Sequence, residues 1–246
     1  MRLKLISCEI FFYEVKFLKS LLNNKLDVEF LSKGLHDIKS SDMLKQLQDA
    51  VDRNDNSNQY DYILLGYGLC NNGVSGLKSK NIPLVIPRVH DCIAVLMGSL
   101  TKYQKYFDEH PGCYYLSPGW VEFGIIDDKK SIQSQIKMNQ SYEYFLNFYG
   151  EDNAQFLYEQ LSAQTNHYSE LTYIKTGTKK DSFYKEIAEQ EALDKKWDFL
   201  IYEGSLCFLK RFLSGDWNDE EFIIINPGSE LKPSYDSKVF KKYSIS

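Results

Sequence analysis

Residues 60–70, which read YDYILLGYGLC, form the stretch that decides the fold class. Their apolar run ends at Leu65, Gly66-Tyr67-Gly68 follows it, and the polar residues 52–59 precede it. A short apolar run bounded by turn residues predicts a strand that is covered on both faces. Strands of this kind belong to parallel sheets with helices packed on both sides.

Further strand patterns alternate with helical periodicity around this stretch. Short apolar runs predict strands at residues 3–7, 27–31, 82–86 and 113–116. Apolar residues at helical spacing lie between them, including one long predicted helix over residues 93–107. Because parallel neighbours need crossover connections, the pattern predicts an α/β fold with an open, mostly parallel sheet flanked by helices.

The second half of the chain predicts a helical excursion and then renewed alternation. The pattern turns helical and polar from residue 124, and strand and helix patterns return at residue 171. We therefore divide the chain into an α/β domain at 1–123 that carries the candidate site, a helical segment at 124–170, and a second, smaller α/β portion at 171–246 that packs on the first. The last residues, from Lys232, are expected to form a ragged tail.

Composition and charge exclude several classes of function. The chain has 246 residues and a net charge of −5, with scattered lysines and arginines, so it lacks the basic surface that nucleic acid binding needs. Its N-terminal apolar run is too short for a signal peptide, and no stretch approaches the ~20 apolar residues that span a bilayer. We expect a cytoplasmic protein without membrane contact. There, its five cysteines are buried thiols, metal ligands or a nucleophile rather than disulfides.

Three cysteines stand at the ends of predicted strands. Cys8 ends the first strand, Cys70 follows the third and Cys92 follows the fourth, while His36 comes shortly after the second. Ligands of open α/β sheets bind at the carboxyl ends of the strands, so these side chains are expected to meet in one crevice. Thiolate and imidazole are natural ligands of zinc and iron–sulfur centres, and three thiolates leave an open coordination position.

The alternative for each cysteine is simple packing, because free cysteines are often buried as small apolar groups. The chain has no C-x-x-C pair, which a closed structural zinc site usually contains. We interpret Cys113, inside a strand, and Cys207, on a helix face, as core residues.

The loops beside these cysteines supply candidate catalytic and substrate-binding groups. We assign His90 and Asp91 to catalysis. His90 is also a candidate metal ligand, because it lies two residues before Cys92 and such residues of an extended segment point the same way. Asp91 or Glu9 would orient a ligating histidine. Candidate substrate-binding residues, which would grip an anion or wall the crevice, are Arg88, Asn71, Asn72 and Trp120.

Several motifs of the chain are similar to those of a known family. They are the runs at residues 67–73, 87–94 and 115–120, together with Cys8 and the turns at 215–217 and 227–228. On these motifs the chain resembles a prokaryotic family called domain of unknown function 1638, over nearly its whole length. The resemblance implies an association with corrinoid-dependent methyltransferase systems and one-carbon metabolism, in which a thiolate-bound metal fits.

Three hypotheses of function follow. The first is a metal-dependent enzyme, a transferase or lyase, that acts on a small anionic or methylated substrate. Cys8, Cys70 and Cys92 hold zinc or an iron–sulfur cluster, with His90 or His36 as a further ligand. The second is a non-catalytic protein that handles a metal or corrinoid for a methyltransferase partner. The third is a metal-free thiol enzyme with Cys70 or Cys92 as nucleophile and His90 as base.

Overall fold

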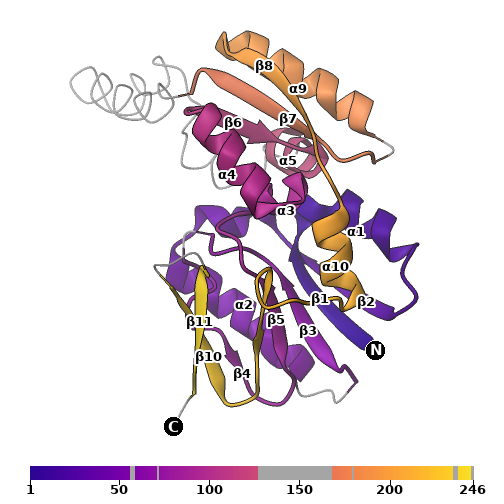
Figure 1. Cartoon of the computed structure of the whole chain (residues 1–246), viewed down its shortest axis with the longest axis vertical. Coiled ribbons are helices and arrows are strands. Elements are labelled where there is room, and N and C mark those ends of the chain that lie inside the picture. The colour runs from indigo at the N-terminus through magenta and orange to yellow at the C-terminus, as the bar shows by residue number, and fades with distance from the viewer. Residues whose placement is uncertain (56–58, 71, 127–167, 179, 235–237, 245–246) are drawn as a thin grey trace, which may run out of the picture.

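The computed structural model describes residues 1–55, 59–70, 72–126, 168–178, 180–234 and 238–244. These residues form two lobes, stacked along the long axis of the molecule (Figure 1). We call the part built on the five-stranded sheet β2-β1-β3-β5-β9 the large lobe, and the part built on the three-stranded sheet β6-β7-β8 the small lobe.

The sheet of the large lobe confirms the predicted open, mostly parallel arrangement. Its strands are β1 (Arg2–Cys8), β2 (Lys25–Leu31), β3 (Tyr62–Gly66), β5 (Leu84–Pro87) and β9 (Phe222–Ile225). The first four are parallel, and β9 is antiparallel to β5. The chain starts in β1, turns to β2 on one side and then passes to β3 on the other. The strand order therefore reverses between β1 and β3, which is the switch point where such sheets bind ligands.

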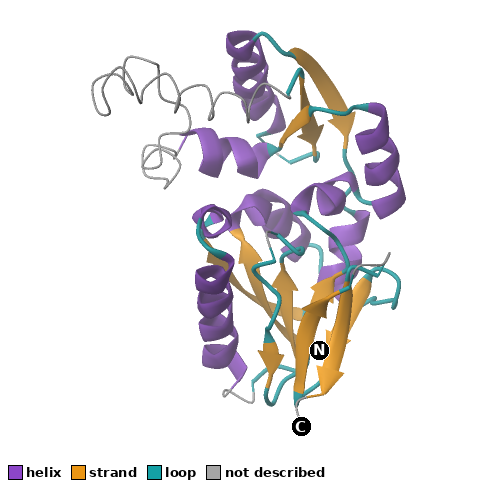
Figure 2. Cartoon of the chain, turned by 90° about the vertical axis from the view of Figure 1, so that its left-hand side faces the viewer, coloured by secondary structure: helices purple, strands orange, loops and turns teal. Residues whose placement is uncertain are grey.

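Helices cover both faces of this sheet. They are α1 (Phe12–Lys19), α2 (Ser40–Asp55), α3 (Cys92–Met97) and α10 (Cys207–Ser214), with short 3-10 helices η1 (Glu9–Phe11) and η2 (Lys33–Asp37) after β1 and β2. Right-handed crossovers in opposite directions along the sheet place α1 and α2 on opposite faces. Helices accordingly lie on either side of the strands in Figure 2. The core between these layers is apolar and includes the fully buried Leu5, Ile63, Leu64 and Val85.

The small lobe has a parallel sheet and a core of its own. Its sheet contains β6 (Cys113–Leu116), β7 (Glu170–Lys175) and β8 (Asp198–Glu203). Its helices are α4 (Leu100–Glu109), α5 (Pro118–Trp120), the π-helix η3 (Val121–Ile126) and α9 (Asp181–Lys195). Leu116, Leu171, Tyr173 and Tyr184 are buried together beneath α9.

Strands from before residue 123 pair with strands from about residue 170 onward, so both sheets combine parts of the chain that the sequence divisions separate. Strand β6 pairs with β7, and β9 pairs with β5, so the chain leaves the large lobe after α3 and returns to it with α10. The division into three domains stays a prediction. Most of the predicted helical segment, residues 127–167, lies outside the described residues.

The single long helix predicted over 93–107 is wrong, because it is interrupted at Gly98. This residue has a φ of +78° and ends α3, and the Ser99 hydroxyl then caps α4. A Cβ on Gly98 would stand 2.5 Å from the Cβ of Ser205. The break is therefore set by a contact with a segment about a hundred residues away, which helical periodicity does not reveal.

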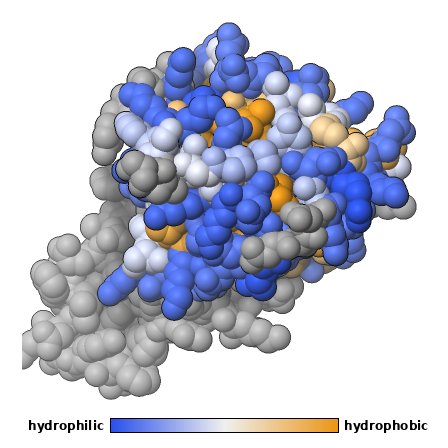
Figure 3. Space-filling view, turned by 90° about the horizontal axis from the view of Figure 1, so that it is seen from below, coloured by the Kyte–Doolittle hydropathy of each residue, from blue (hydrophilic) through white to orange (hydrophobic). Residues whose placement is uncertain are grey.

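The ragged tail predicted from Lys232 is also wrong. Strands β10 (Ser229–Pro233) and β11 (Phe240–Ser244) pair antiparallel, and β10 also pairs with β4 (Lys78–Ser79). Leu231 and Phe240 are buried in the core of the large lobe. Within the described part of the chain, no helix has the length and apolar content to cross a membrane. The face seen from below is mostly hydrophilic, with small, separate hydrophobic areas (Figure 3).

Candidate thiol site at the sheet switch point

The three predicted cysteines stand at the carboxyl ends of adjacent strands. Cys8 is the last residue of β1, Cys70 follows β3, and Cys92 follows β5 and begins α3. Because β1, β3 and β5 are parallel neighbours, their ends share one edge, and Cys8 and Cys70 flank the switch point. Cys8 and Cys92 are buried, and Cys70 is partly buried.

His36 lies against the Cys8 thiol. Its Nε2 is 3.5 Å from Sγ of Cys8. The 3-10 helix η2 that carries His36 is tied to the end of β1, because the backbone N–H of Lys33 donates to Oε1 of Glu9 at 2.6 Å. The Ser32 side chain caps the start of η2 by accepting from the N–H of Gly34.

Gly68 lets the Cys70 loop run along the Cys92 loop. The N–H groups of Leu69 and Cys70 donate to the carbonyls of Val89 and His90 at 2.9 and 3.0 Å. A Cβ on Gly68 would stand 2.9 Å from both the N of Asp91 and the carbonyl oxygen of Val89, so a side chain at this position would force the loops apart. The N–H groups of Leu69 and Cys70 are thus occupied by carbonyls rather than open to an anion.

Trp120 closes the site from the small lobe. Its Nε1 donates to Sγ of Cys92 at 3.3 Å, and its ring centroid is 6.2 Å from that of His36. The Nζ of the buried Lys33 lies 5.5 Å from the Trp120 ring centroid. The preceding Gly119 permits this position, because a Cβ there would stand only 1.8 Å from the carbonyl oxygen of Ile10.

Tyr67 is a residue of the site that the sequence did not assign. It is 2 % exposed, and its ring centroid is 6.3 Å from that of His36. Among the residues that the structure describes, its hydroxyl has no hydrogen-bond partner. A buried hydroxyl without a partner is costly, and it marks a place where a ligand atom or water would be accommodated. In the sequence it is marked only by its place between Gly66 and Gly68, after the strand at residues 60–65, which does not by itself indicate a role.

Burial raises the pKa of every thiol in this group. It raises the pKa of Cys70 to about 12 and the pKa of Cys8 still further. Burial also raises the pKa of Cys92 well above its usual range, helped by the negative charges of Asp91, Cys70 and Cys8. The three thiols thus lie within electrostatic reach of one another and are protonated at neutral pH unless a cation joins them.

The remaining predicted site residues are engaged elsewhere or exposed. Asp91 caps α3 by accepting from the N–H groups at its start, and it accepts from the Tyr103 hydroxyl at 2.7 Å. Arg88 donates to the carbonyls of Phe222, Lys238 and Phe240.

Of the histidine and asparagines of these loops, the described residues His90 and Asn72 are both exposed. His90 is exposed while Cys92 is buried, so the expected common direction of these two side chains is wrong, because the helix starts at Cys92. Asn72 is exposed with a φ of +65°. Asn71 lies outside the described residues.

The two other cysteines differ from each other. Cys113 is buried, as expected, and donates to Oγ1 of Thr172 at 3.0 Å inside the small lobe. Cys207 is exposed, so its interpretation as a core residue is wrong. It is the first residue of α10, whose buried face begins with Phe208 and Leu209.

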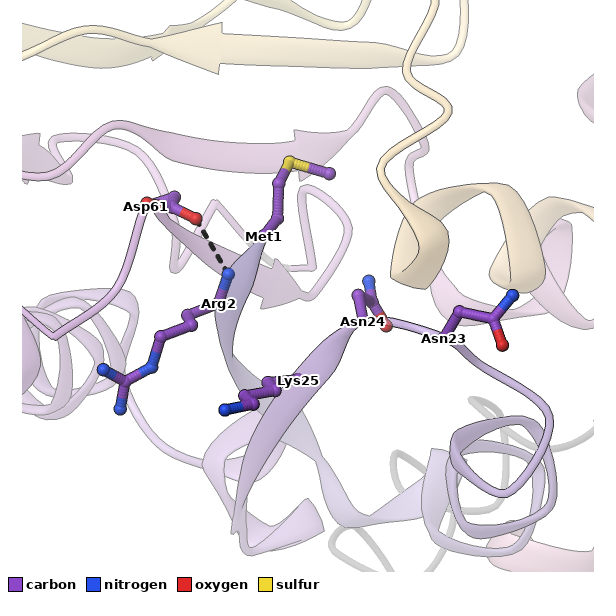
Figure 4. Close-up of a pocket in the computed structure, with 6 residues that line it drawn as sticks. All are labelled: Met1, Arg2, Asn23, Asn24, Lys25 and Asp61. Atoms are coloured by element: carbon purple, nitrogen blue, oxygen red, sulfur yellow. Dashed lines mark hydrogen bonds between the residues drawn. The ribbon is translucent and has the colours of Figure 1, made fainter.

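No preformed metal site is present among the described residues, in the sense that no three or more His, Cys, Asp or Glu side chains are grouped to hold an ion. A surface pocket lies at the opposite, amino edge of the sheet (Figure 4). Its lining residues are Met1, Arg2, Asn23, Asn24, Lys25 and Asp61. We place the functional site at the carboxyl edge, because the strand order reverses there and the thiols and the Tyr67 hydroxyl gather there.

A comparison with family models decides the relationship of the chain. The model described as protein of unknown function (DUF1638) matches residues 30–213, which is most of the chain. The chain belongs to this family. The DUF1638 match starts inside β2 and therefore covers His36, Cys70, Cys92 and Trp120 but not Cys8. Searches of the curated proteins and of the solved structures found no match.

Proposed function

We propose that this DUF1638 protein is a metal-dependent enzyme acting on a small anionic or methylated substrate. Zinc or an iron–sulfur centre is held by the thiolates of Cys8, Cys70 and Cys92, and His36 completes the set at rest. The observation that carries the proposal is the contact of His36 Nε2 with Cys8 Sγ at the switch point, beside two further thiols.

The distance between His36 and Cys8 suits two ligands of one ion. In a tetrahedral zinc site, bonds of ~2.3 Å to sulfur and ~2.1 Å to nitrogen put the two atoms about 3.6 Å apart. The observed separation is 3.5 Å. The loops of Cys70 and Cys92 run side by side at the same edge of the sheet, which supports a common site with Cys8.

The chemistry of the donors also fits a soft metal ion. Thiols whose pKa is raised by burial hold their protons in the free protein, and a bound cation would replace those protons. A substrate oxygen would take the place of His36 as the fourth ligand, and the metal would then serve as a Lewis acid toward it. The indole N–H of Trp120 would remain a hydrogen-bond donor to the Cys92 sulfur and so reduce its negative charge.

Tyr67 supplies the substrate-binding group that Arg88 does not. Burial raises the pKa of Tyr67 well above its usual range, so the hydroxyl stays protonated and can donate. Because no described residue accepts from it, we assign it to an oxygen of the substrate. Trp120 would form one wall of the same crevice.

Metal analysis of anaerobically purified protein tests the proposal. We expect one ion or cluster per chain by elemental analysis, with thiolate charge-transfer absorption after cobalt substitution. Cys8→Ser and Cys92→Ser should lose most of the metal. Cys113→Ser and Cys207→Ser are matched controls, one buried and one exposed, that should keep it. Full activity in metal-free protein, or equal metal content in all four variants, would end the proposal.

A second candidate function is a binding protein that handles a metal or a corrinoid for a methyltransferase partner. This candidate is favoured because two groups predicted for catalysis and substrate binding have structural roles instead. Asp91 caps α3, and Arg88 donates to backbone carbonyls. This candidate predicts stoichiometric binding and no conversion of small substrates without a partner. A metal-free thiol enzyme is disfavoured, because a nucleophilic cysteine needs a lowered pKa and burial raises that of Cys70.

A further inference from the structure

The candidate thiol site is closed in this structure. Cys92 is 6 % exposed and Tyr67 is 2 % exposed, so a ligand in solution has almost no access to either side chain. The group that covers Cys92 belongs to the other lobe, because the indole of Trp120 donates to its Sγ at 3.3 Å. Entry of a ligand therefore requires the protein to move, and the small lobe is the part that stands in the way.

The two lobes are joined by two chain crossings that lie side by side. The chain leaves the large lobe at Gly98, between α3 and α4, and returns to it at Gly204, between β8 and α10. The N–H of Ser205 donates to the Leu96 carbonyl at 3.0 Å, and a Cβ on Gly204 would stand 2.7 Å from the same carbonyl oxygen. Small residues at element ends are typical hinge positions, because they absorb changes in φ and ψ. Two adjacent crossings of this kind define one axis of rotation.

Each lobe has a core of its own and can move as a unit. Among the buried residues that the structure describes, Ile174 is the small-lobe side chain that packs into the large-lobe core. It lies at the crossings, because a Cβ on Gly204 would stand 2.9 Å from its Cγ2. This apolar contact is therefore beside the axis, where a rotation displaces it least.

Trp120 lies on the side of the small lobe away from the crossings. It follows β6, which is the edge strand of the small sheet opposite β8, and the end of β8 leads to Gly204. A rotation about the crossings therefore moves Trp120 farther than it moves Ile174. The same rotation would lift α5 from η1 and separate the indole from the Cys92 sulfur.

The other contacts between the lobes include hydrogen bonds that water can replace. The Tyr13 hydroxyl of α1 lies 2.5 Å from the Tyr184 hydroxyl of α9. Oε1 of the buried Glu14 accepts from the Thr176 hydroxyl, just after β7, at 2.7 Å. Because these groups would bind water once the lobes separate, each bond adds only modestly to the stability of the closed form.

We propose that the small lobe is a hinged cover of the thiol site, which rotates about Gly98 and Gly204 to admit a ligand. The inference rests on the proposed function for the identity of the site, but it concerns access alone. In the open form Trp120 leaves Cys92, and the carboxyl edge of the large sheet faces solvent. Return of the cover encloses the ligand, excludes water and restores the indole to the sulfur.

Alkylation of the five native cysteines with N-ethylmaleimide, followed for each peptide by mass spectrometry, tests the cover. The full chain is used with a chelator, so the result does not depend on a bound metal. Cys113 is the matched reference, because it is 7 % exposed but lies inside the small lobe. We expect Cys92 to react about tenfold or more faster than Cys113, and more slowly than the exposed Cys207. Its rate should also rise less steeply with urea, because opening exposes less surface than unfolding does.

Two tyrosine variants show which contacts hold the cover closed. Tyr13→Phe removes a hydrogen bond between the lobes and should raise the alkylation rate of Cys92 about fivefold. Tyr60→Phe is the matched control, because the Tyr60 hydroxyl donates to Asp27 within the large lobe, and it should leave that rate unchanged.

Equal rates and equal urea dependence for Cys92 and Cys113 in the wild type would mean that the site is reached only by unfolding, and would overturn the proposal. The same acceleration of Cys92 in both tyrosine variants would also overturn it, since the large lobe itself would then be opening. Either failure would leave the metal proposal standing, because metal content decides that proposal.

Discussion

The indole Nε1 of Trp120 donates a hydrogen bond to Sγ of Cys92 at 3.3 Å. Trp120 packs against the cores of both lobes, whereas Cys92 belongs to the core of the large lobe. A thiol of the candidate site is thus held by a side chain from α5 of the small lobe. A change in the position of the small lobe would therefore alter this hydrogen bond and, with it, the pKa of the Cys92 thiol.

Replacing Trp120 by Phe removes this donor and keeps an aromatic wall. The hydrogen bond lowers the pKa of Cys92 against the larger effect of burial, so its loss should raise that pKa further. We expect about a tenfold weaker cobalt affinity, equivalent to ~1.4 kcal/mol, and a shifted thiolate-to-cobalt band in optical titration. An unchanged band and affinity would show that the hydrogen bond has no influence on the site.

Gly119→Ala should destabilise the protein by about 3 kcal/mol, measured by urea unfolding. The added Cβ would stand 1.8 Å from the Ile10 carbonyl oxygen, so α5 must move away from η1. Gly124→Ala is the matched control in the next turn, where the nearest atom would be 3.7 Å away. Equal stabilities for the two variants would contradict the close approach of α5.

Tyr67→Phe should separate stability from binding. Deleting a buried hydroxyl that has no described partner should raise the free energy of unfolding by about 1 kcal/mol. The same change should weaken binding of acetate or phosphate to the cobalt-loaded protein by about tenfold, read from the cobalt spectrum, without changing metal content. Loss of stability on this substitution would mean that the hydroxyl is satisfied in the free protein.

Arg88→Met should act on the fold and leave the metal in place. The guanidinium donates to the carbonyls of Phe222, Lys238 and Phe240, so its removal leaves three acceptors, two of them partly buried, without this donor. We expect a loss of about 2–3 kcal/mol in unfolding experiments and faster hydrogen exchange in β11. Metal content should match that of the wild type. If the variant has normal stability but binds substrate poorly, Arg88 is a substrate-binding residue after all.

The pH dependence of stability should report on Glu14. Its folded pKa of about 7 exceeds its ordinary value of 4.5, so the stabilisation is complete below pH 4.5 and is lost as pH rises through 7. Relative to Glu14→Gln, wild-type stability should fall by on the order of 3 kcal/mol across this range. Parallel curves for the two proteins would contradict an elevated pKa.

The meeting of Cys8, Cys70 and Cys92 was predictable from the sequence because it depends only on strand ends. An apolar run fixes a strand, and the carboxyl ends of parallel strands share an edge, so residues after such runs converge without knowledge of side-chain packing. His36 followed by the same reasoning and lies against Cys8.

The contacts made between lobes were beyond the sequence patterns. The expectation that His90 shares the direction of Cys92 failed because the cap at Asp91 starts a helix between them. The position of Trp120 over Cys92 and the break at Gly98 depend on contacts with η1 and Ser205, which no local periodicity encodes. Tyr67 was overlooked because its importance lies in a missing partner, which only coordinates reveal.

The contact of Gly98 with Ser205 has a consequence for how the molecule could have been assembled. The N–H of Ser205 donates to the Leu96 carbonyl at 3.0 Å, so the chain departs for the small lobe and comes back at adjacent points. A segment whose two ends touch can be gained or lost without reshaping its host. The small lobe is therefore an insertion between α3 and α10, and a short turn joining these two helices would remove it while keeping the strand order of the large sheet.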